Sequence, residues 1–529
     1  MSEKIFNFFD TKGVKMKNFS RAVAVFFAAI VLLFSVNATA VAERVMRPYQ
    51  PNIVVFLLDD ARVDDILHMP YAQKYLVKGG TIFKNSFVVR SLCCPSRVTL
   101  LTGQYPHNHG VKDNEINGLY GYQILDHRNT LPIWLQDAGY YTGLFGKYLN
   151  GYGGSDSSTV AGVPPYEVPQ GWDIWQALVG PDQYDYVNFR INHNNTVETF
   201  THSYSTDVLK IKAVRFLNKA RESGKPFYLS FNAIAPHSGG SGGALPPGRA
   251  YPAPRHLGKY KDKMMPTTPS FNETNVNDKP AYIRQMPSFS VKTTADITRK
   301  WRRRVESLLA VDEAIAAIVQ KLESTGQIDN TVIILTSDNG FMLGEHRIGW
   351  GKKVMYEESY RVPFVIRGPG IPKGATVNLM VKNIDWAPTI LDLADARATY
   401  ATTGNEFPMD GASFAPILYG DNDWAIRNWT KDFIMEGYYL SKETSVNDRF
   451  KGLHTKRYAY VKYDTGEKEL YDLLRDPYQM HNKINNPAYA GVAKVLQWRF
   501  ENLRSCVGEE CRDNSFWDSH EWDSLMKVD

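Results

Sequence analysis

Three mostly apolar runs in the chain each end in polar side chains. They are residues 52–60, which end in Asp59 and Asp60; residues 226–237, which end in His237; and residues 331–340, which contain Asp338 and Asn339. Strands of this kind are typical of the centre of a parallel or mixed sheet that is covered on both faces. Binding sites in open α/β sheets lie at the carboxyl edge, so we expect these polar groups to meet there.

A helical repeat precedes the last of these runs. Apolar side chains recur at steps of three and four from Trp301 to Leu322, which predicts a long amphipathic helix. Asp312 interrupts the apolar face, and we favour a hydrogen-bonded core carboxylate over a role in a site. The neighbouring residues 302–304 are all arginine, and we interpret them as a solvated helix face.

The remaining patterns predict a loop region and a second, smaller domain. The glycine-rich residues 238–243 and the polar residues 251–294 lack periodicity and are interpreted as loops at a pocket rim. Short alternating segments then predict an antiparallel sheet, followed by a helix near 486–504. The segments are residues 432–439, 457–463 and 468–473.

The first 42 residues have the features of a secretory leader. A run of fifteen residues, 22–36, is apolar except for Ser35 and follows Lys15, Lys17 and Arg21, and small residues precede a cleavage site after Ala42. The run is shorter than the roughly 20 residues that span a bilayer, so we expect an exported protein without a stable membrane span. The formal charge is +5; removal of the leader leaves the chain near neutral, which argues against a nucleic-acid partner.

Four cysteines form two pairs with different expected fates. In an exported chain Cys506 and Cys511 are spaced to close a small disulfide loop. Cys93 and Cys94 are adjacent and poorly placed to bond each other, which favours reactive chemistry for that pair.

One motif decides the functional interpretation. Residues 93–103 read Cys-Cys-Pro-Ser-Arg-Val-Thr-Leu-Leu-Thr-Gly, which resembles the type I sulfatase signature Cys-x-Pro-Ser-Arg-x-x-x-Leu-Thr-Gly. Within that family, residues 92–97, 105–109 and 146–150 look most like N-acetylglucosamine-6-sulfatases.

The resemblance implies a fold and a domain organisation. The fold is α/β and alkaline-phosphatase-like: a large mixed sheet sandwiched by helices, with a smaller C-terminal domain built on an antiparallel sheet. We expect a signal peptide at 1–42, a catalytic domain at 43–417 and a C-terminal α+β subdomain at 418–529. The implied substrate is a sulfated oligosaccharide or polysaccharide, with 6-O-sulfated glucosamine units as the first candidate.

The resemblance also implies that a maturation enzyme oxidises Cys93 to formylglycine. A plain serine or cysteine attacking sulfur would leave a stable sulfated side chain, whereas an aldehyde hydrate avoids this. One hydroxyl attacks sulfur and expels the alcohol, and deprotonation of the other then releases sulfate and restores the aldehyde. Cys94 is one place off the motif and is expected to stay unmodified and packed.

Sulfate transfer needs a hard divalent cation with several oxygen ligands. The resemblance assigns this role to Asp59, Asp60, Asp338 and Asn339, with the oxygen of the modified Cys93 completing the ligand set. An Asp-Asp pair alone is more often a turn or cap. Calcium, one ion per chain, is preferred to magnesium because the family uses it.

Cations are also needed to neutralise charge on the transferred group. Arg97 lies one helical turn after Cys93, and the family pattern selects Lys147 and Lys352, the latter in preference to Lys353. The chain departs from the family at Leu149, where a histidine is often found. This leaves open which side chains share the protonation of the leaving group.

His237 matches the family's histidine that protonates the leaving oxygen, a task suited to imidazole. His109 and His346 are weaker candidates for substrate binding.

Two other functions stay open beside the sulfatase interpretation. The first alternative is a phosphate or phosphonate ester hydrolase of the same superfamily. The second is a noncatalytic carbohydrate-binding protein, prompted by an aromatic content of 13%.

Overall fold

The computed structural model describes residues 50–154, 166–180, 182–239, 249–420, 424, 429–437, 449–519 and 525–526. The predicted leader and most of the glycine-rich segment 238–243 lie outside these residues. No helix among the described residues is both long and apolar enough to cross a membrane.

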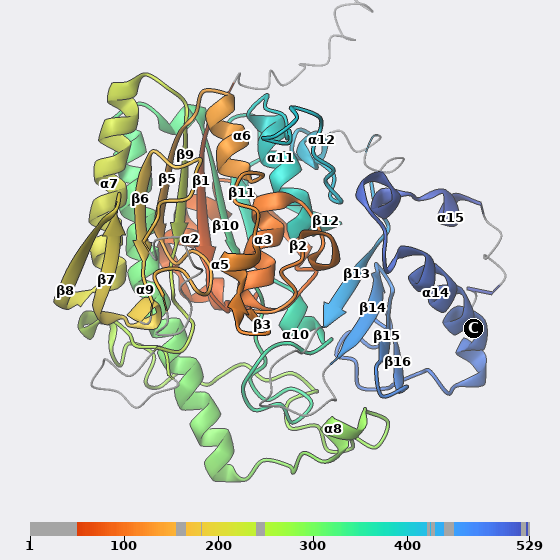
Figure 1. Ribbon diagram of the computed structural model, residues 1–529. Helices are drawn as coiled ribbons and strands as arrows, with labels where there is room; N and C mark the ends of the chain where they lie inside the picture. Colours follow the sequence, from red (N-terminus) through yellow and green to blue (C-terminus); the bar gives the residue numbers. More distant parts are fainter. Residues whose placement is uncertain are drawn as a thin grey trace, which may run out of the picture. The chain divides into compact units, whose positions relative to one another are not determined.

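A ten-stranded mixed sheet forms the centre of the fold (Figure 1). In order across the sheet its strands are β12 (Ala375–Lys382), β2 (Thr81–Phe87), β11 (Phe364–Arg367), β10 (Thr331–Ser337), β1 (Asn52–Leu58), β9 (Phe227–Asn232), β5 (Tyr141–Gly146), β6 (Ile174–Leu178), β7 (Val187–His193) and β8 (Thr196–Tyr204). β1 runs parallel to both β10 and β9. The three predicted central strands are therefore neighbours, and their carboxyl ends meet.

Helices cover both faces of this sheet, as the uninterrupted apolar pattern of the central strands requires. Alternate residues of β1 enter two different cores: Val54, Phe56 and Leu58 pack with α7 (Ser205–Ser223) and α9 (Val291–Ser324). Ile53, Val55 and Leu57 face the other core, with α3 (Cys93–Thr102), α6 (Leu131–Asp137) and α11 (Trp386–Leu393). The expected alkaline-phosphatase-like architecture is confirmed.

The predicted amphipathic helix is α9, and it begins before the apolar repeat does. Ser290 caps its N-terminus by accepting a hydrogen bond from the backbone N–H of Thr293. Asp312 accepts hydrogen bonds from the backbone N–H groups of Tyr71 (2.9 Å) and Ala72 (2.7 Å). This confirms its interpretation as a hydrogen-bonded core carboxylate.

A separate four-stranded antiparallel sheet lies toward the C-terminus, as predicted. Its order is β13 (Asp432–Gly437), β14 (Phe450–Thr455), β15 (Tyr458–Tyr463) and β16 (Lys468–Asp472), and α14 (Ala490–Leu503) packs on it. The sequence pattern missed β14, which contains Gly452 and alternates poorly. The domain boundary at 417/418 stays a prediction.

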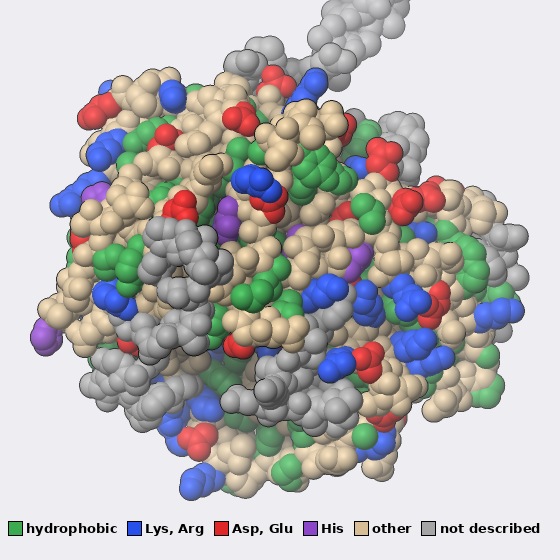
Figure 2. All heavy atoms as spheres, in the orientation of Figure 1, with side chains coloured by type: hydrophobic (Ala, Val, Ile, Leu, Met, Phe, Trp, Pro, Cys, Tyr) green, Lys and Arg blue, Asp and Glu red, His purple; other side chains and the backbone are tan. Residues whose placement is uncertain are grey.

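Three lysines stand directly opposite one another on this smaller sheet. Lys451 pairs with Lys462, which pairs with Lys468. Like charges in this register repel, and two carboxylates offset part of the repulsion: Lys462 binds Glu501 of α14 at 3.2 Å, and Lys451 binds Glu436 of β13 at 3.0 Å. Lys468 donates a hydrogen bond of 3.1 Å to the neutral side chain of Gln497. Figure 2 shows Lys and Arg side chains gathered over this sheet and helix.

The other short elements lie in the connections. They are α2 (Pro70–Ala72), α4 (Pro106–His109), α5 (Gly121–Ile124), α8 (Ala281–Arg284), α10 (Glu357–Tyr360), α12 (Ala415–Leu418), α15 (Ser515–Asp518), β3 (Glu115–Ile116) and β4 (Leu119–Tyr120). Residues 251–290 are irregular apart from α8 and a 3₁₀ turn at Pro254–His256, as the loop prediction requires. The last four residues of the predicted loop, 291–294, belong to α9 instead.

Candidate active site

The carboxyl ends of β1 and β10 bring the predicted oxygen groups together. Asp338 donates its backbone N–H to the carbonyl of Leu58 (3.0 Å), and the backbone N–H of Asp60 donates to Asp338 Oδ1 (3.1 Å). Asn339 Nδ2 donates to Asp60 Oδ1 at 2.7 Å. Asp59, Asp60, Asp338 and Asn339 are all buried. Their convergence follows from the in-register pairing of two parallel strands.

Asp60 has a backbone conformation that few residues other than glycine adopt. Its φ is 71°, and two neighbours hold the turn: Ser337 Oγ accepts from the N–H of Ala61 (2.8 Å), and Arg304 Nη2 donates to the carbonyl of Asp60. Such strain persists only where surrounding contacts over-determine it. The turn aims the Asp60 carboxylate into the cluster.

Arg304 was missed as a residue that supports the site, and its interpretation as part of a solvated face is wrong. It has no exposed surface, and its guanidinium also binds Asp65 Oδ2 (3.2 Å) and the carbonyl of Pro236 (3.3 Å). Arg302 and Arg303 remain partly exposed. The three arginines differ in their position around the helix, and only the Arg304 side chain is directed toward the ends of the strands. The sequence, with three adjacent arginines, does not show which of them is buried.

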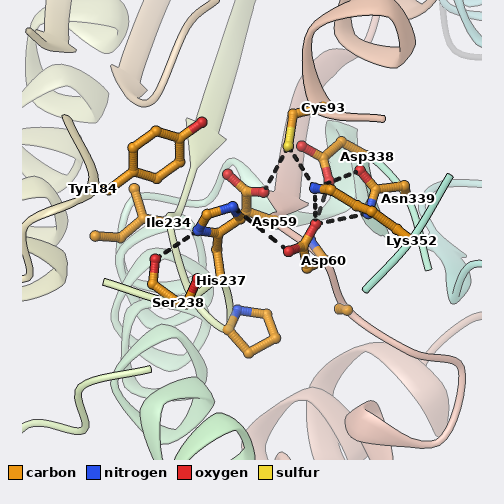
Figure 3. Close-up of polar contacts among 12 residues, drawn as sticks. Asp59, Asp60, Cys93, Tyr184, Ile234, His237, Ser238, Asp338, Asn339 and Lys352 are labelled. Atoms are coloured by element: carbon orange, nitrogen blue, oxygen red, sulfur yellow. Dashed lines mark hydrogen bonds and ion pairs between the residues drawn. The ribbon is translucent and has the colours of Figure 1, made fainter. Parts of the chain in front are cut away.

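Cys93 is the first residue of α3, and its thiol points into the same cluster (Figure 3). Sγ lies 3.5 Å from Asp59 Oδ1 and 2.7 Å from Lys352 Nζ. Burial raises the pKa of the Cys93 thiol to about 12, and the Asp59 carboxylate adds to the rise. The unmodified thiol is therefore a poor nucleophile. Cys94 packs fully buried in the core, as expected.

Three predicted cations contact the carboxylates. Arg97 Nε binds Asp338 Oδ2 at 2.8 Å, and Lys147 Nζ binds Asp59 Oδ2 at 2.5 Å. Lys352 Nζ binds Asp60 Oδ1. Burial alone would lower the pKa of each cation, but the facing carboxylates outweigh it and raise these pKa values. All three side chains stay charged at neutral pH.

His237 reaches the cluster from the segment after β9. Its Nδ1 lies 2.7 Å from the carbonyl of Ser238, which can only accept, so Nδ1 carries the proton. Nε2 therefore faces Asp60 Oδ2 at 3.6 Å (Figure 3). Burial lowers the pKa of His237, although the carboxylates of Asp60 and Asp59 act in the opposite direction.

Tyr184 was not singled out from the sequence, because nothing in its local pattern marks it. It ends a 3₁₀ turn, Asp182–Tyr184, between β6 and β7. Its ring stacks on His237 with centroids 4.5 Å apart, and Lys147 Nζ lies 4.5 Å from the ring centroid. The tyrosine therefore contacts two of the predicted catalytic side chains.

The two weaker histidine candidates lie in other surroundings. His109 Nε2 lies 3.1 Å from Thr99 Oγ1, and its Nδ1 accepts from the backbone N–H of Val111. His346 has no exposed surface, and its Nδ1 lies 2.6 Å from Glu273 Oε2. Substrate binding by either residue stays a prediction that these contacts do not support.

The cluster is able to hold a metal ion. One ligand atom each from Asp59, Asp60, Cys93 and His237 lies within 4.8 Å of the others, and Asp338 and Asn339 add further oxygens. A pocket of three carboxylates and an amide suits a hard cation such as calcium. The Lys352 ammonium already lies among Asp60, Asn339 and Cys93, which shows that this space accommodates positive charge.

Cys506 and Cys511, whose spacing left a disulfide open, are bonded to each other. The carbonyl of Cys506 accepts hydrogen bonds from His107 and Asn108 of α4, each at 2.9 Å. His107 Nδ1 also lies 2.6 Å from Glu436 Oε1 of β13. These contacts fasten the chain segment that follows the Cys93 helix to the smaller sheet.

Comparisons with known proteins agree with the motif. The sulfatase family model matches residues 51–396, and a model of the C-terminal region of N-sulphoglucosamine sulphohydrolase matches residues 344–506. An arylsulfatase of Volvox carteri is 33% identical, with 87% of this chain and 76% of the relative covered. An N-acetylglucosamine-6-sulfatase of Capra hircus is 31% identical, with 89% and 86% covered.

A solved structure extends the comparison to three dimensions. It is a protein in complex with its substrate D-glucosamine-2-N,6-O-disulfate, with 27% identity and a TM-score of 0.69, and the match covers 88% of this chain and 99% of that one. The family match spans more than half of the chain, and it includes Cys93 and every residue of the cluster. The chain therefore belongs to the sulfatase family.

Proposed function

We propose that the protein is an exported, calcium-dependent sulfatase that removes a sulfate ester from a saccharide, with 6-O-sulfated glucosamine units as its substrate class. The observation that supports this most is the position of Cys93. Its Sγ lies at the cluster of oxygen ligands, 3.5 Å from Asp59 Oδ1 and 2.7 Å from the ammonium group of Lys352. The glucosamine assignment rests on the motif wording and on the named relatives.

Asp59, Asp60, Asp338 and Asn339 would hold the calcium ion, which when bound supplies a Lewis acid for the sulfate oxygens. Without a cation, three buried carboxylates repel one another, and burial together with the Asp59 charge raises the pKa of Asp338. Arg97 and Lys147 already offset part of this repulsion through Asp338 and Asp59. The same two cations face the region where the sulfuryl group would lie.

Cys93 would act as formylglycine, whose hydrated aldehyde supplies the attacking hydroxyl. Asp59 lies close enough to the Cys93 side chain, 3.5 Å from Sγ, to accept a proton from that position. Lys352, 2.7 Å from Sγ, is placed to stabilise negative charge on the same atom position. A formylglycine-generating maturation enzyme is therefore a required partner.

His237 would protonate the leaving oxygen. Its Nδ1–H is committed to the carbonyl of Ser238, which leaves Nε2 to carry and donate the transferred proton. Burial lowers the pKa of His237, so its protonated form is a stronger acid than free imidazolium. Leu149, where the family often has a histidine, is buried in the core and takes no part.

The leader at 1–42 would direct export and then be removed, and segments 43–417 and 418–529 would form the catalytic domain and the C-terminal subdomain. Residues of the second segment support the first: Glu436 binds His107, beside the Cys93 helix. Neither segment is therefore expected to be active alone.

The proposal is tested by sulfate release from a panel of defined saccharides. The panel contains N-acetylglucosamine 6-sulfate, N-acetylglucosamine 3-sulfate and galactose 6-sulfate, which distinguish a preference for the sugar from a preference for the sulfate position. Matched aryl sulfate and aryl phosphate esters test whether the protein is instead a phosphate ester hydrolase. We expect the 6-sulfated glucosamine to be cleaved fastest and the phosphate ester slowest. Preferred cleavage of phosphate would overturn the sulfatase assignment.

A further inference from the structure

Tyr184 contacts two predicted catalytic side chains, His237 after β9 and Lys147 after β5. Its ring stacks on the His237 imidazole at 4.5 Å with an interplanar angle of 23°, and it lies 4.5 Å from Lys147 Nζ. The negative face of an aromatic ring attracts cations, and aromatic rings also stack on one another in offset arrangements. One side chain thus contacts the proposed proton donor and a proposed sulfuryl-binding cation.

The tyrosine is itself held in place. Asn150 Nδ2 donates a hydrogen bond of 3.0 Å to Tyr184 Oη, and Asn150 is buried in the segment that follows Lys147. Tyr184 is half-buried, and it reaches the site from a turn between two strands. Its ring position is therefore fixed from the same segment that carries Lys147.

The imidazole of His237 has few other constraints. Tyr186 Oη donates to the backbone carbonyl of His237 at 2.7 Å, which fixes the main chain but not the ring. Among the described residues the ring has one hydrogen bond, to the adjacent carbonyl of Ser238, and Nε2 lies beyond hydrogen-bond distance from Asp60. The stack with Tyr184 is the contact that selects the ring plane.

We propose that Tyr184 is a positioning residue that holds the His237 imidazole with Nε2 directed toward the leaving oxygen, and that holds the Lys147 ammonium beside it. His237 is the one histidine in the metal-ligand cluster found among the described residues, and the position two residues after Lys147 is a buried leucine. Proton donation therefore depends on the orientation of a single ring.

This inference rests on the proposed sulfatase activity, and substrates with different leaving groups test it. 4-Nitrophenyl sulfate releases a phenolate that departs without a proton, whereas N-acetylglucosamine 6-sulfate releases an alkoxide that needs one. In Tyr184→Leu the ratio of kcat for the saccharide to kcat for the aryl ester should fall about 10- to 100-fold, the scale of a misplaced general acid. Tyr184→Phe keeps the ring that contacts His237 and Lys147 and loses the hydrogen bond from Asn150, so it should keep most of the wild-type ratio.

An equal loss on both substrates in Tyr184→Leu would overturn the inference, because it would show general damage to the site. A Tyr184→Phe ratio as low as that of Tyr184→Leu would overturn it too, because the hydroxyl rather than the ring would matter. Crystal structures of both variants give a readout independent of turnover. The His237 ring should turn or lose order in Tyr184→Leu only, and an unchanged ring there would contradict the proposal.

These outcomes are distinct from failure of the proposed function. If the wild-type protein released no sulfate from either substrate, the sulfatase proposal would fail, and the crystal structures would still decide whether Tyr184 orients His237.

Discussion

Lys352 Nζ lies 2.7 Å from Cys93 Sγ, although 259 positions separate the two residues in the sequence. Lys353, the next residue, points elsewhere, has a φ of 73° and lies 3.8 Å from Asp113. Two adjacent lysines therefore have different environments, which makes them a matched pair for mutation.

Lys352→Ala should lower kcat at least about 100-fold, the scale of losing one preorganised group that stabilises developing charge. Lys353→Ala should change kcat less than about threefold, since its partner Asp113 is not in the metal-ligand cluster. Steady-state kinetics with an aryl sulfate measures both. Equal losses in the two variants would show that the family pattern selected the wrong lysine.

Asp338→Asn tests the metal site, because it removes one carboxylate and keeps the side-chain size. Calcium affinity and sulfate release should fall together by at least about 100-fold, as expected for a charged ligand to the catalytic ion.

In the wild type, chelation should lower Tm by a few degrees and added calcium should restore it, because an ion at 100 times its Kd stabilises the native state by about 2.7 kcal/mol. Normal turnover in enzyme shown to be metal-free by elemental analysis would refute the assignment.

Arg304→Met should destabilise the protein by about 3–5 kcal/mol, because it leaves Asp65 as an unpaired buried charge. It should also weaken calcium binding, because Arg304 donates to the carbonyl of Asp60 and so holds the strained backbone that directs the Asp60 carboxylate into the cluster. Arg302→Met is the control on the same helix, because Arg302 donates to the carbonyl of Lys263 near the surface. Denaturant unfolding with and without calcium measures both effects, and similar results for the two variants would contradict the supporting role.

The pair of Glu436 and His107 should make stability sensitive to acid. Burial would raise the pKa of Glu436, but the hydrogen bond and charge of His107, together with those of Lys451, outweigh it and lower the pKa to about 2. A lowered carboxylate pKa contributes stability that is complete above the unfolded pKa of about 4.3 and is lost as the pH falls toward 2.

Glu436→Gln should therefore cost about 3 kcal/mol at pH 7, and the difference from wild type should shrink between pH 4.5 and about 2. Glu501→Gln removes a partly exposed partner of Lys462 and Arg504 and should cost at most about 1 kcal/mol. Urea unfolding at several pH values gives these differences. A Glu436→Gln difference that does not vary with pH would show that the ion pair is not its source.

The sequence predicted which side chains meet at the ends of β1 and β10 because they belong to local patterns. Asp59 and Asp338 follow apolar runs, and parallel strands bring such ends together whatever lies between them. Cys93 and Arg97 are fixed in relation to each other by one turn of helix. The central strands and the long helix were predicted on similarly local grounds, whereas the spacing of Cys506 and Cys511 allowed a disulfide without deciding it.

The residues that were missed depend on contacts between distant segments. Tyr184 enters the site from a turn with no periodic pattern, and Arg304 differs from its neighbours only in the direction of its side chain. The start of α9 was missed because its first turns are polar, and Val291 is 90% exposed. Hydrophobic periodicity identifies the apolar side chains that pack against a core. The position of Tyr184, the direction of the Arg304 side chain and the polar first turns of α9 do not produce such a pattern.

The central claim is that Cys93 is the source of the nucleophile, and peptide mass spectrometry combined with activity tests it most directly. Preparations made with and without a maturation enzyme will contain different fractions of modified Cys93. Conversion of the thiol to an aldehyde makes that residue about 18 Da lighter. Sulfate release should rise in proportion to the lighter fraction, while Cys94 stays unmodified. Full activity in a preparation whose Cys93 is entirely unmodified would contradict the account.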